Sequence, residues 1–594
     1  MDKEHQSLKK FLCFKVNARE LAALKRHFSL GLIACTWLAT PVLAQQANQP
    51  GFDPRQTEKR FEDQDARQGS RGDQPRLPSL RPTRAEENAT APMMLLRQVF
   101  IEGATAIPQS RLASAYEPYL GQRVSHADLA KIVNAISESY RVAGFHLSRA
   151  IIPPQDAANG ELRIKVIEGA ITELLMTGDE ANQFGVRTMM EPVIAERPAR
   201  LATLERQLYL TNARPGMSIK DTAIEEIGSA SGQFRLVLSI RTWHFFASVG
   251  VDNFGSSSVG PWQSYGTVAY NSALTPGDSV AVNLSTTPGD PRQLAFGRVA
   301  YELPVGIDGV RIGASGYYSE VRPGDFRRLD NDHVKTSTFE MHGIIAPLQS
   351  QKATVTLTAA ATFTNTSEAD VYGLWYADKI RTASFTFDGR LQDDLRGTNY
   401  LTVNYRQGLD IFGASQSIDE FLSREGASGQ FAAMTVWFTR YQTLSDAWSI
   451  KVAAAGQTAS GPLFTSQQFY LGGLAFGRGY GSAEISGDNG LAGSAELRFD
   501  QQTSLQHLNG YQIYGFIDSG VAWNSGYQLH DGLSLTSVGG GIRLFLKDGI
   551  QADLGVAVPL TYRAYDNDTR DARVLFSLSS AVRLCPVRSA TRCL

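Results

Sequence analysis

The residue types that most often carry catalysis form no recognisable constellation in this chain of 594 residues. Its histidines are scattered, and the H-E-x-x-H, G-x-S-x-G and P-loop patterns are absent from the sequence. Gly477, Gly479 and Gly481 form a glycine-rich string, but it lies between expected β-strands and opens no helix, so it does not predict a nucleotide site. We therefore predict no enzyme activity, no catalytic residues, no cofactor and no metal site.

Arg478 and Asp518 are candidates for a buried ion pair. Side chains alternate between the two faces of a strand, and this separates an apolar face of residues 511–518 from the face that carries Asp518. A carboxylate shielded from water needs a cationic partner. Arg478, on a glycine-rich loop that permits a tight tip, can supply a bidentate one. In the alternative interpretation Arg478 is solvated and Asp518 only lines a channel.

The segment from Trp243 to Leu584 must position this pair, and its apolar residues recur with period two. The pattern is clear in 280–285, 354–363, 401–406 and 550–558, with glycine, proline, aspartate and asparagine between such segments. Alternating segments of about ten residues are typical of a transmembrane β-barrel, whose polar phase faces the lumen. At about twenty residues for each strand and its connection, the region 243–584 holds about 16 strands. A large soluble β-sandwich or propeller is the alternative.

Two α/β modules, at 93–168 and 169–241, are predicted before the barrel. In the first, Ser125 and Asp128 resemble a capping box that starts an amphipathic helix ending at Gly144. Both modules have the order β-α-α-β-β. Expected elements of the first are strands at 95–101, 145–152 and 161–167 and a first helix at about 110–119. Those of the second are strands at 171–178, 217–227 and 234–240 and helices at about 182–195 and 201–212.

The N-terminal segment indicates export. Basic residues precede an apolar stretch, and small residues before Ala44 form a cleavage site, so 1–44 is predicted to be a signal peptide. The string 32–35 resembles a lipoprotein box, which leaves lipidation at Cys35 as the alternative. Residues 45–92 are predicted to be a polar linker with a charged helix at about 53–68, and 585–594 a C-terminal tail. The two cysteines that remain after cleavage, Cys585 and Cys593, form no disulfide framework.

Composition excludes two classes of protein. The 57 basic and 59 acidic residues give a net charge of -2, which argues against nucleic-acid binding. A mean hydropathy of -0.19 argues against a multispanning helical membrane protein. The fold class that remains is mainly β, a transmembrane antiparallel barrel preceded by two α/β modules.

Three groups of motifs resemble the TpsB family, the outer-membrane transporters of two-partner secretion. The strings at 100–103, 140–145 and 166–169 resemble its POTRA domains. Phe476, Gly477, Arg478, Gly479 and Tyr480 resemble the tip of its inward-folded sixth extracellular loop, although Gly477 replaces the usual valine. Phe516, Asp518 and Gly520 resemble its Phe-x-Asp-x-Gly barrel-wall motif.

This resemblance implies a Gram-negative outer-membrane protein whose periplasmic POTRA domains bind a large secreted TpsA-type exoprotein of the haemolysin, haemagglutinin or adhesin type. The barrel is then expected to export this partner unfolded through its pore. The resemblance also implies contact with outer-membrane lipids, insertion by the barrel-assembly machinery, an Arg478–Asp518 contact that anchors the loop, and a plug helix at 53–68. The alternative function is that of a BamA- or TamA-like assembly factor for other barrels, and a passive diffusion porin is a further one. Two modules behind a polar linker favour the exporter.

Overall fold

The computed structural model describes residues 92–156, 159–178, 181–228, 231–256, 258–526, 532–561 and 570–584. The expected signal peptide, the possible plug helix and the C-terminal tail with its two cysteines lie outside these residues. None of the described helices has both the length and the apolar composition needed to cross a membrane.

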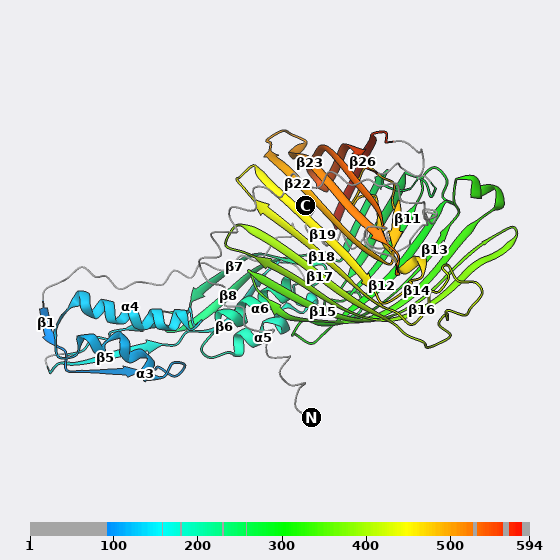
Figure 1. Ribbon diagram of the computed structural model, residues 1–594. Coiled ribbons are helices and arrows are strands. Elements are labelled where there is room, and N and C mark those ends of the chain that lie inside the picture. Colours follow the sequence, from blue (N-terminus) through cyan, green and yellow to red (C-terminus); the bar gives the residue numbers. More distant parts are fainter. Residues whose placement is uncertain are drawn as a thin grey trace, which may run out of the picture. The chain divides into compact units, whose positions relative to one another are not determined.

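The first module packs one long helix against a three-stranded sheet (Figure 1). In the sheet order β2-β5-β4, β2 is parallel and β4 antiparallel to β5. Leu112, Ile132, Ile136, Leu162 and Ile164 are buried in its core. The elements are β1 (Pro92–Leu95), β2 (Gln98–Glu102), α3 (Gln109–Leu112), η2 (Ala113–Ala115), η3 (Glu117–Tyr119), β3 (Arg123–Ser125), α4 (His126–Val142), β4 (Arg149–Ile151) and β5 (Glu161–Ile167).

Helix α4 confirms its predicted start, because the Ser125 hydroxyl accepts a hydrogen bond from the Asp128 amide and the Asp128 carboxylate accepts one from the Ser125 amide. Three predicted elements are wrong. The strand at 95–101 is split, since β1 pairs with β3 and not with the main sheet. The helix at 110–119 is one α-turn followed by two 3-10 turns, with Pro118 in the second. The strand at 145–152 shrinks to β4, because Phe145 turns into the core below α4.

Glu168 ties the end of β5 to the rest of the first module. Its carboxylate accepts hydrogen bonds of 2.7 Å from the amides of Thr105 and Ala106 and from the Tyr140 hydroxyl, and one from the Thr105 hydroxyl. Burial raises the pKa of Glu168, but these hydrogen bonds lower it by more, so the net pKa lies below the usual value. Burial and the neighbouring Glu168 raise the pKa of Tyr140.

The second module repeats the order of the first. Its sheet has the order β6-β8-β7, again with one parallel and one antiparallel pair. Phe184, Met190, Leu208, Leu236 and Leu238 are fully buried in its core. The elements are β6 (Ala170–Thr177), η4 (Ala181–Phe184), α5 (Val186–Ala195), α6 (Leu201–Asn212), β7 (Met217–Glu226) and β8 (Gln233–Thr242).

The third region is a closed antiparallel barrel, in which β26 pairs with β9 (Figure 1). Its 16 strands agree with the number predicted from the sequence. The strands are β9 (Phe245–Asp252), β10 (Gln263–Asn271), β11 (Ser279–Thr286), β12 (Leu294–Val305), β13 (Val310–Val321), β14 (His333–Gln349), β15 (Ala353–Asp370), β16 (Gly373–Gln392), β17 (Gly397–Gly408), β18 (Ala432–Thr443), β19 (Trp448–Ala459), β22 (Asn489–Gln502), β23 (Leu508–Trp523), β24 (Leu533–Leu546), β25 (Ile550–Pro559) and β26 (Arg573–Leu584). We call the end of the barrel at which β9 begins the near end and the opposite end the far end.

The predicted phase of β23 is confirmed. Ile513 and Ile517 are about half exposed on the outer face, whereas Tyr514, Phe516 and Asp518 are buried on the inner face. The period of the strand therefore places Asp518 inside the barrel, as the sequence predicted.

Candidate functional site: the anchor of loop L6

The sixth connection at the far end, residues 460–488, is a long loop that we call L6. It contains η6 (Thr465–Gln467) and a small hairpin of β20 (Phe469–Leu471) and β21 (Ile485–Gly487). Phe476, Arg478 and Tyr480, at the tip of L6, are all buried, and Tyr480 is fully so. The tip therefore packs against the barrel interior and is not a solvated loop end.

Asp518 receives this tip. Its Oδ2 atom accepts hydrogen bonds from the Gly477 amide at 3.3 Å, the Arg478 amide at 3.1 Å and the Arg478 Nε at 2.9 Å. Its Oδ1 atom accepts from the Arg478 Nη2 at 2.8 Å and from the Ser494 hydroxyl at 2.7 Å. The fork between guanidinium and carboxylate is thus bidentate, and the backbone of the loop binds the same carboxylate.

Arg478 has a second carboxylate partner, Glu496 of β22, which its Nη1 atom contacts. The face of the guanidinium group lies on the Phe516 ring, with 3.4 Å between Cζ and the ring centroid. Arg478 is therefore held by two anions and one aromatic ring, all provided by the barrel wall.

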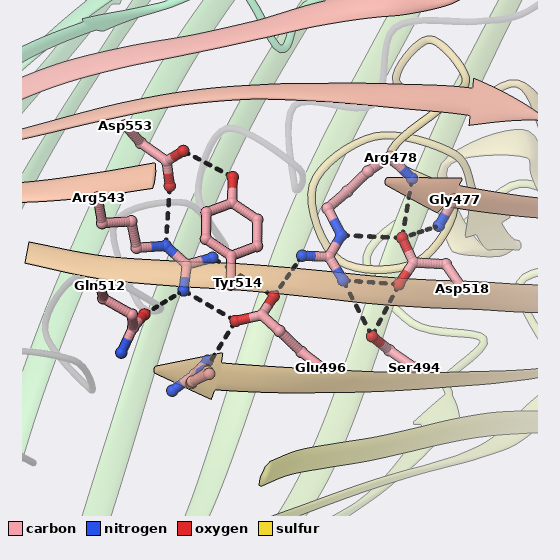
Figure 2. A network of polar contacts seen from close by, with 10 residues as sticks. Gly477, Arg478, Ser494, Glu496, Gln512, Tyr514, Asp518, Arg543 and Asp553 are labelled. Carbon is pink, nitrogen blue, oxygen red and sulfur yellow. Dashed lines mark hydrogen bonds and ion pairs between the residues drawn. The ribbon is translucent and has the colours of Figure 1, made fainter. Parts of the chain in front are cut away.

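Glu496 extends the contact into a network across four strands (Figure 2). Its carboxylate also accepts hydrogen bonds from Arg498 and Arg543, each at 2.8 Å. Arg543 in turn donates to Asp553 at 2.8 Å, and it lies 3.8 Å from the centroid of the Tyr514 ring. Tyr514 donates to Asp553 at 2.7 Å. Three guanidinium groups and three carboxylates alternate in this network, so their formal charges balance.

Gly477 is the point where the tip departs from the valine of the family motif. Its φ of +95° lies in the left-handed region, and a Cβ atom there would come within 2.6 Å of Leu535 Cδ1. A β-branched residue would be strained in this backbone conformation. Glycine is therefore the residue that lets two consecutive amides turn toward Asp518.

The other tip residues pack on the neighbouring strands. Gly479 donates its amide to the Ser537 hydroxyl at 3.2 Å, and Tyr480 donates its hydroxyl to the Thr536 carbonyl at 3.0 Å. The Phe476 ring lies 5.2 Å from that of Trp437. Gly520 of β23 approaches Leu471, since a Cβ atom on it would lie 2.8 Å from Leu471 Cδ1. All the predicted tip and barrel-wall residues thus gather in one region.

A second buried carboxylate, Asp488, holds the base of L6. It pairs with Arg424 of the loop between β17 and β18 and accepts hydrogen bonds from the amides of Leu463 at 3.0 Å and Ser525 at 2.8 Å. Asp488 is fully buried. Three consecutive far-end loops therefore meet at one carboxylate.

Arg573, the first residue of β26, links the tip to the closure of the barrel. Its guanidinium group donates to the carbonyls of Tyr480, Asn253 and Gly255. Asn253 and Gly255 directly follow β9, the strand that pairs with β26. Through Arg573, the L6 tip is therefore linked to β26 and to the residues that follow β9.

Sequence reasoning placed Arg478 and Asp518 together but missed Glu496, Arg543 and Asp553. A signal for Glu496 was present, because Ser494, Glu496 and Arg498 alternate with apolar residues in β22. In the described part of the chain, no group of three His, Cys, Asp or Glu side chains has an arrangement that could hold a metal ion. The site holds the tip of L6 through paired charges.

The models of two protein families match this chain. The model of the haemolysin secretion/activation protein family ShlB/FhaC/HecB matches residues 237–544, just over half of the chain. The chain belongs to this family. The model of the ShlB-type POTRA domain matches residues 94–169, which are the first module. The family consists of TpsB transporters of the outer membrane and is not an enzyme family.

Two of the matched relatives are named as transporters. The heme/hemopexin transporter protein HuxB of Haemophilus influenzae is 23% identical over 495 residues, which are 80% of this chain and 84% of the relative. The outer membrane transporter CdiB of Escherichia coli is 23% identical over 408 residues, 67% of this chain and 68% of the relative. The solved structure of CdiB from Escherichia coli superposes with a TM-score of 0.71 at 19% identity and covers 91% of this chain and all of that one.

The family fixes the orientation of the barrel. The protein resides in the outer membrane with its POTRA domains in the periplasm. The near end, where the chain enters β9, is therefore periplasmic, and the far end with L6 is extracellular.

Proposed function

We propose that this chain exports a large partner exoprotein of the haemolysin, haemagglutinin or adhesin type, unfolded, through its barrel. The observation that carries the proposal is the L6 tip, which is buried inside a closed 16-strand barrel by the Arg478–Asp518 fork. A barrel of about this size encloses an aqueous lumen. A loop held against the lumenal wall leaves that lumen to a passing chain.

Recognition of the partner is assigned to the two POTRA modules. In the described part of the chain, each module has a three-stranded sheet whose two outer strands pair on one side only. A strand of the partner's secretion domain can add to such an edge, with neighbouring side chains giving selectivity. Folding of the partner outside the cell would supply the direction of transport, and the barrel-assembly machinery would insert the transporter itself.

Deletion of residues 93–241 tests the proposal. Secretion of the partner should stop, while the barrel stays inserted and keeps its heat-modifiable migration. The matched control is Arg187→Ala, an exposed position on helix α5 away from the sheet edges, which keeps both modules and should secrete normally. Continued secretion by the deletion variant would remove the recognition role of the modules. Loss of other outer-membrane barrels in a strain that lacks the whole protein would favour a BamA- or TamA-like assembly factor.

A further inference from the structure

The outward face of β13–β16 changes its chemistry toward the extracellular end. Paired residues of the four strands form successive rows across this face. From the periplasmic side the rows are Ile312, Gly343, Ala359 and Phe385; then Ala314, Met341, Ala361 and Ala383; then Gly316, Phe339, Phe363 and Arg381. Phe339, Met341 and Phe385 are each about half exposed. Arg381, at the end of the third row, is buried and donates hydrogen bonds to the Thr364 carbonyl and the Asn365 side chain. The other residues of these rows are apolar or glycine and suit the acyl chains of the membrane.

The next two rows are polar. They consist of Tyr318, Ser337, Asn365 and Lys379, and then of Glu320, Lys335, Ser367 and Ala377. These rows border a hollow of about 290 Å³ on the wall of the barrel. The boundary between the apolar and polar rows is where the headgroups of the outer leaflet must lie.

Lys335 and Lys379 are the unpaired cations of this hollow. Both side chains are exposed, and in the described part of the chain neither ammonium group has an ion-pair or hydrogen-bond partner. Glu320 lies opposite Lys335 and attracts it electrostatically, but the hydrogen bonds that its carboxylate accepts come from Arg322 and from the Tyr318 hydroxyl. The positive charge of the two lysines is thus available to a ligand.

The spacing of the two lysines suits a phosphorylated headgroup. They are separated by two strand positions and by two residues along the strand. With about 4.8 Å between strands and about 3.4 Å per residue, their Cα atoms lie about 12 Å apart. Flexible lysine side chains can bridge this distance, either to one phosphate or to two phosphates on one headgroup. The hydroxyl and amide groups of Ser337, Asn365 and Ser367 between them can bind sugar oxygens.

An aromatic residue of a neighbouring loop borders the apolar side of this face. Phe412, in the loop between β17 and β18, is 74% exposed, and its ring lies 5.7 Å from that of Phe363. Phe363 belongs to the row just below the polar ones. Phe412 therefore adds apolar surface at the depth where acyl chains join their headgroup.

We infer that the outward face of β13–β16 binds the phosphorylated glycolipid of the outer leaflet. Lys335 and Lys379 hold its phosphates, the polar side chains between them contact its sugars, and its acyl chains lie along Phe339, Met341 and Phe412. Position, charge and the adjoining apolar rows together favour this occupant over a protein partner, which would need no apolar rows below the charges. The inference rests on the outer-membrane location and is independent of export.

A binding measurement on the delipidated full-length protein in detergent tests this inference. Diphosphoryl lipid A should bind and raise the unfolding temperature, and the double variant Lys335→Gln/Lys379→Gln should bind it about tenfold more weakly or worse. The variant Lys335→Arg/Lys379→Arg keeps both charges and should retain binding. Lys352→Gln is the matched control, since it removes one exposed lysine charge beside a periplasmic turn and should leave binding unchanged.

The probes separate the sources of the phosphate. Lipid A without phosphates should bind as weakly to the wild-type protein as diphosphoryl lipid A binds to the double variant, and inorganic phosphate alone should not raise the unfolding temperature. The inference is overturned if the double variant binds diphosphoryl lipid A as the wild-type protein does. The inference is also overturned if the wild-type protein binds the phosphate-free lipid or inorganic phosphate as tightly as it binds diphosphoryl lipid A. It is likewise overturned if Lys352→Gln loses as much binding as the double variant. Heat-modifiable migration of every variant shows that it is folded.

Discussion

Two faces of the same barrel treat their charges in opposite ways. Against the inner face of β22–β25, Arg478 of L6 is buried and Arg498 and Arg543 are partly buried, and each contacts a carboxylate. On the outer face of β14–β16, Lys335 and Lys379 are exposed and have no such partner among the described residues. Buried charges must be compensated within the fold, whereas exposed charges are solvated and remain available to a ligand. The inner face is therefore built to hold a loop and the outer face to meet the membrane.

The largest effect is expected from Arg478→Ala, because it leaves Asp518 buried without a cation. Removal of one partner of a buried ion pair costs about 3–5 kcal/mol. The unfolding temperature of the barrel should fall, and secretion of the partner should drop. Asp518→Ala should have a similar effect, and the double variant should be no worse than either single one. Simple addition of the two losses would show that the residues act independently.

Glu496→Gln should have the next largest effect. The amide keeps one acceptor oxygen where the carboxylate has two, and three guanidinium groups, those of Arg478, Arg498 and Arg543, lose an anionic partner. The expected loss is about 2 kcal/mol, measured by thermal unfolding of the barrel. Glu302→Gln is the matched control, since Glu302 pairs with Arg311 in a half-buried position, and its loss should stay below about 1 kcal/mol. Equal losses in the two variants would show that burial of the network has no consequence.

Gly477→Val tests the backbone of the L6 tip without changing the charges of the ion-pair network. The strained φ should cost about 1–3 kcal/mol and weaken the hydrogen bonds from the two amides to Asp518. Protease sensitivity of L6 in intact cells is the measurement. Gly461→Val, in the same loop, has open space around its added side chain and should stay resistant. A protected L6 in Gly477→Val would show that the tip tolerates another conformation.

The first POTRA domain also contains a partly buried carboxylate, that of Glu168, which is compensated by hydrogen bonds. Because the folded pKa of Glu168 is lowered, its carboxylate stabilises the fold above its usual pKa of 4.5, and this contribution is lost as the pH falls through the folded value. Glu168→Gln should therefore be less stable than the wild-type protein at pH 7, and the difference should narrow from about pH 4.5 downward. Hydrogen exchange of the backbone amides in residues 94–169 measures this difference in stability between the variant and the wild-type protein. A difference that does not depend on pH would argue against the ionised carboxylate as its cause.

The smallest effect is expected from Lys335→Gln and Lys379→Gln on the unfolding temperature in lipid-free detergent. Surface substitutions away from paired groups usually change stability by less than about 0.5 kcal/mol. A large loss would mean that these lysines are structural, which would remove the contrast between the two faces.

Local patterns determined what the sequence could predict. The period of β23 placed Asp518 on the inner face, and the capping residues Ser125 and Asp128 placed the start of α4. Arg543 and Asp553 were missed, because the contacts of Arg543 with Glu496 and with Asp553 depend on the register of β22, β23, β24 and β25. Shifting one strand by one residue would turn every side chain to the other face, and a single sequence does not show which residues lie opposite each other.

Arg573 has a consequence for the order of assembly. It is the first residue of β26, the last strand of the barrel, and its bonds reach both the L6 tip and the residues that follow β9. The bonds to Asn253 and Gly255 require that the last strand has met the first. Arg573 therefore has its full set of bonds only in the closed barrel, where one guanidinium group joins the L6 tip to the residues that follow β9.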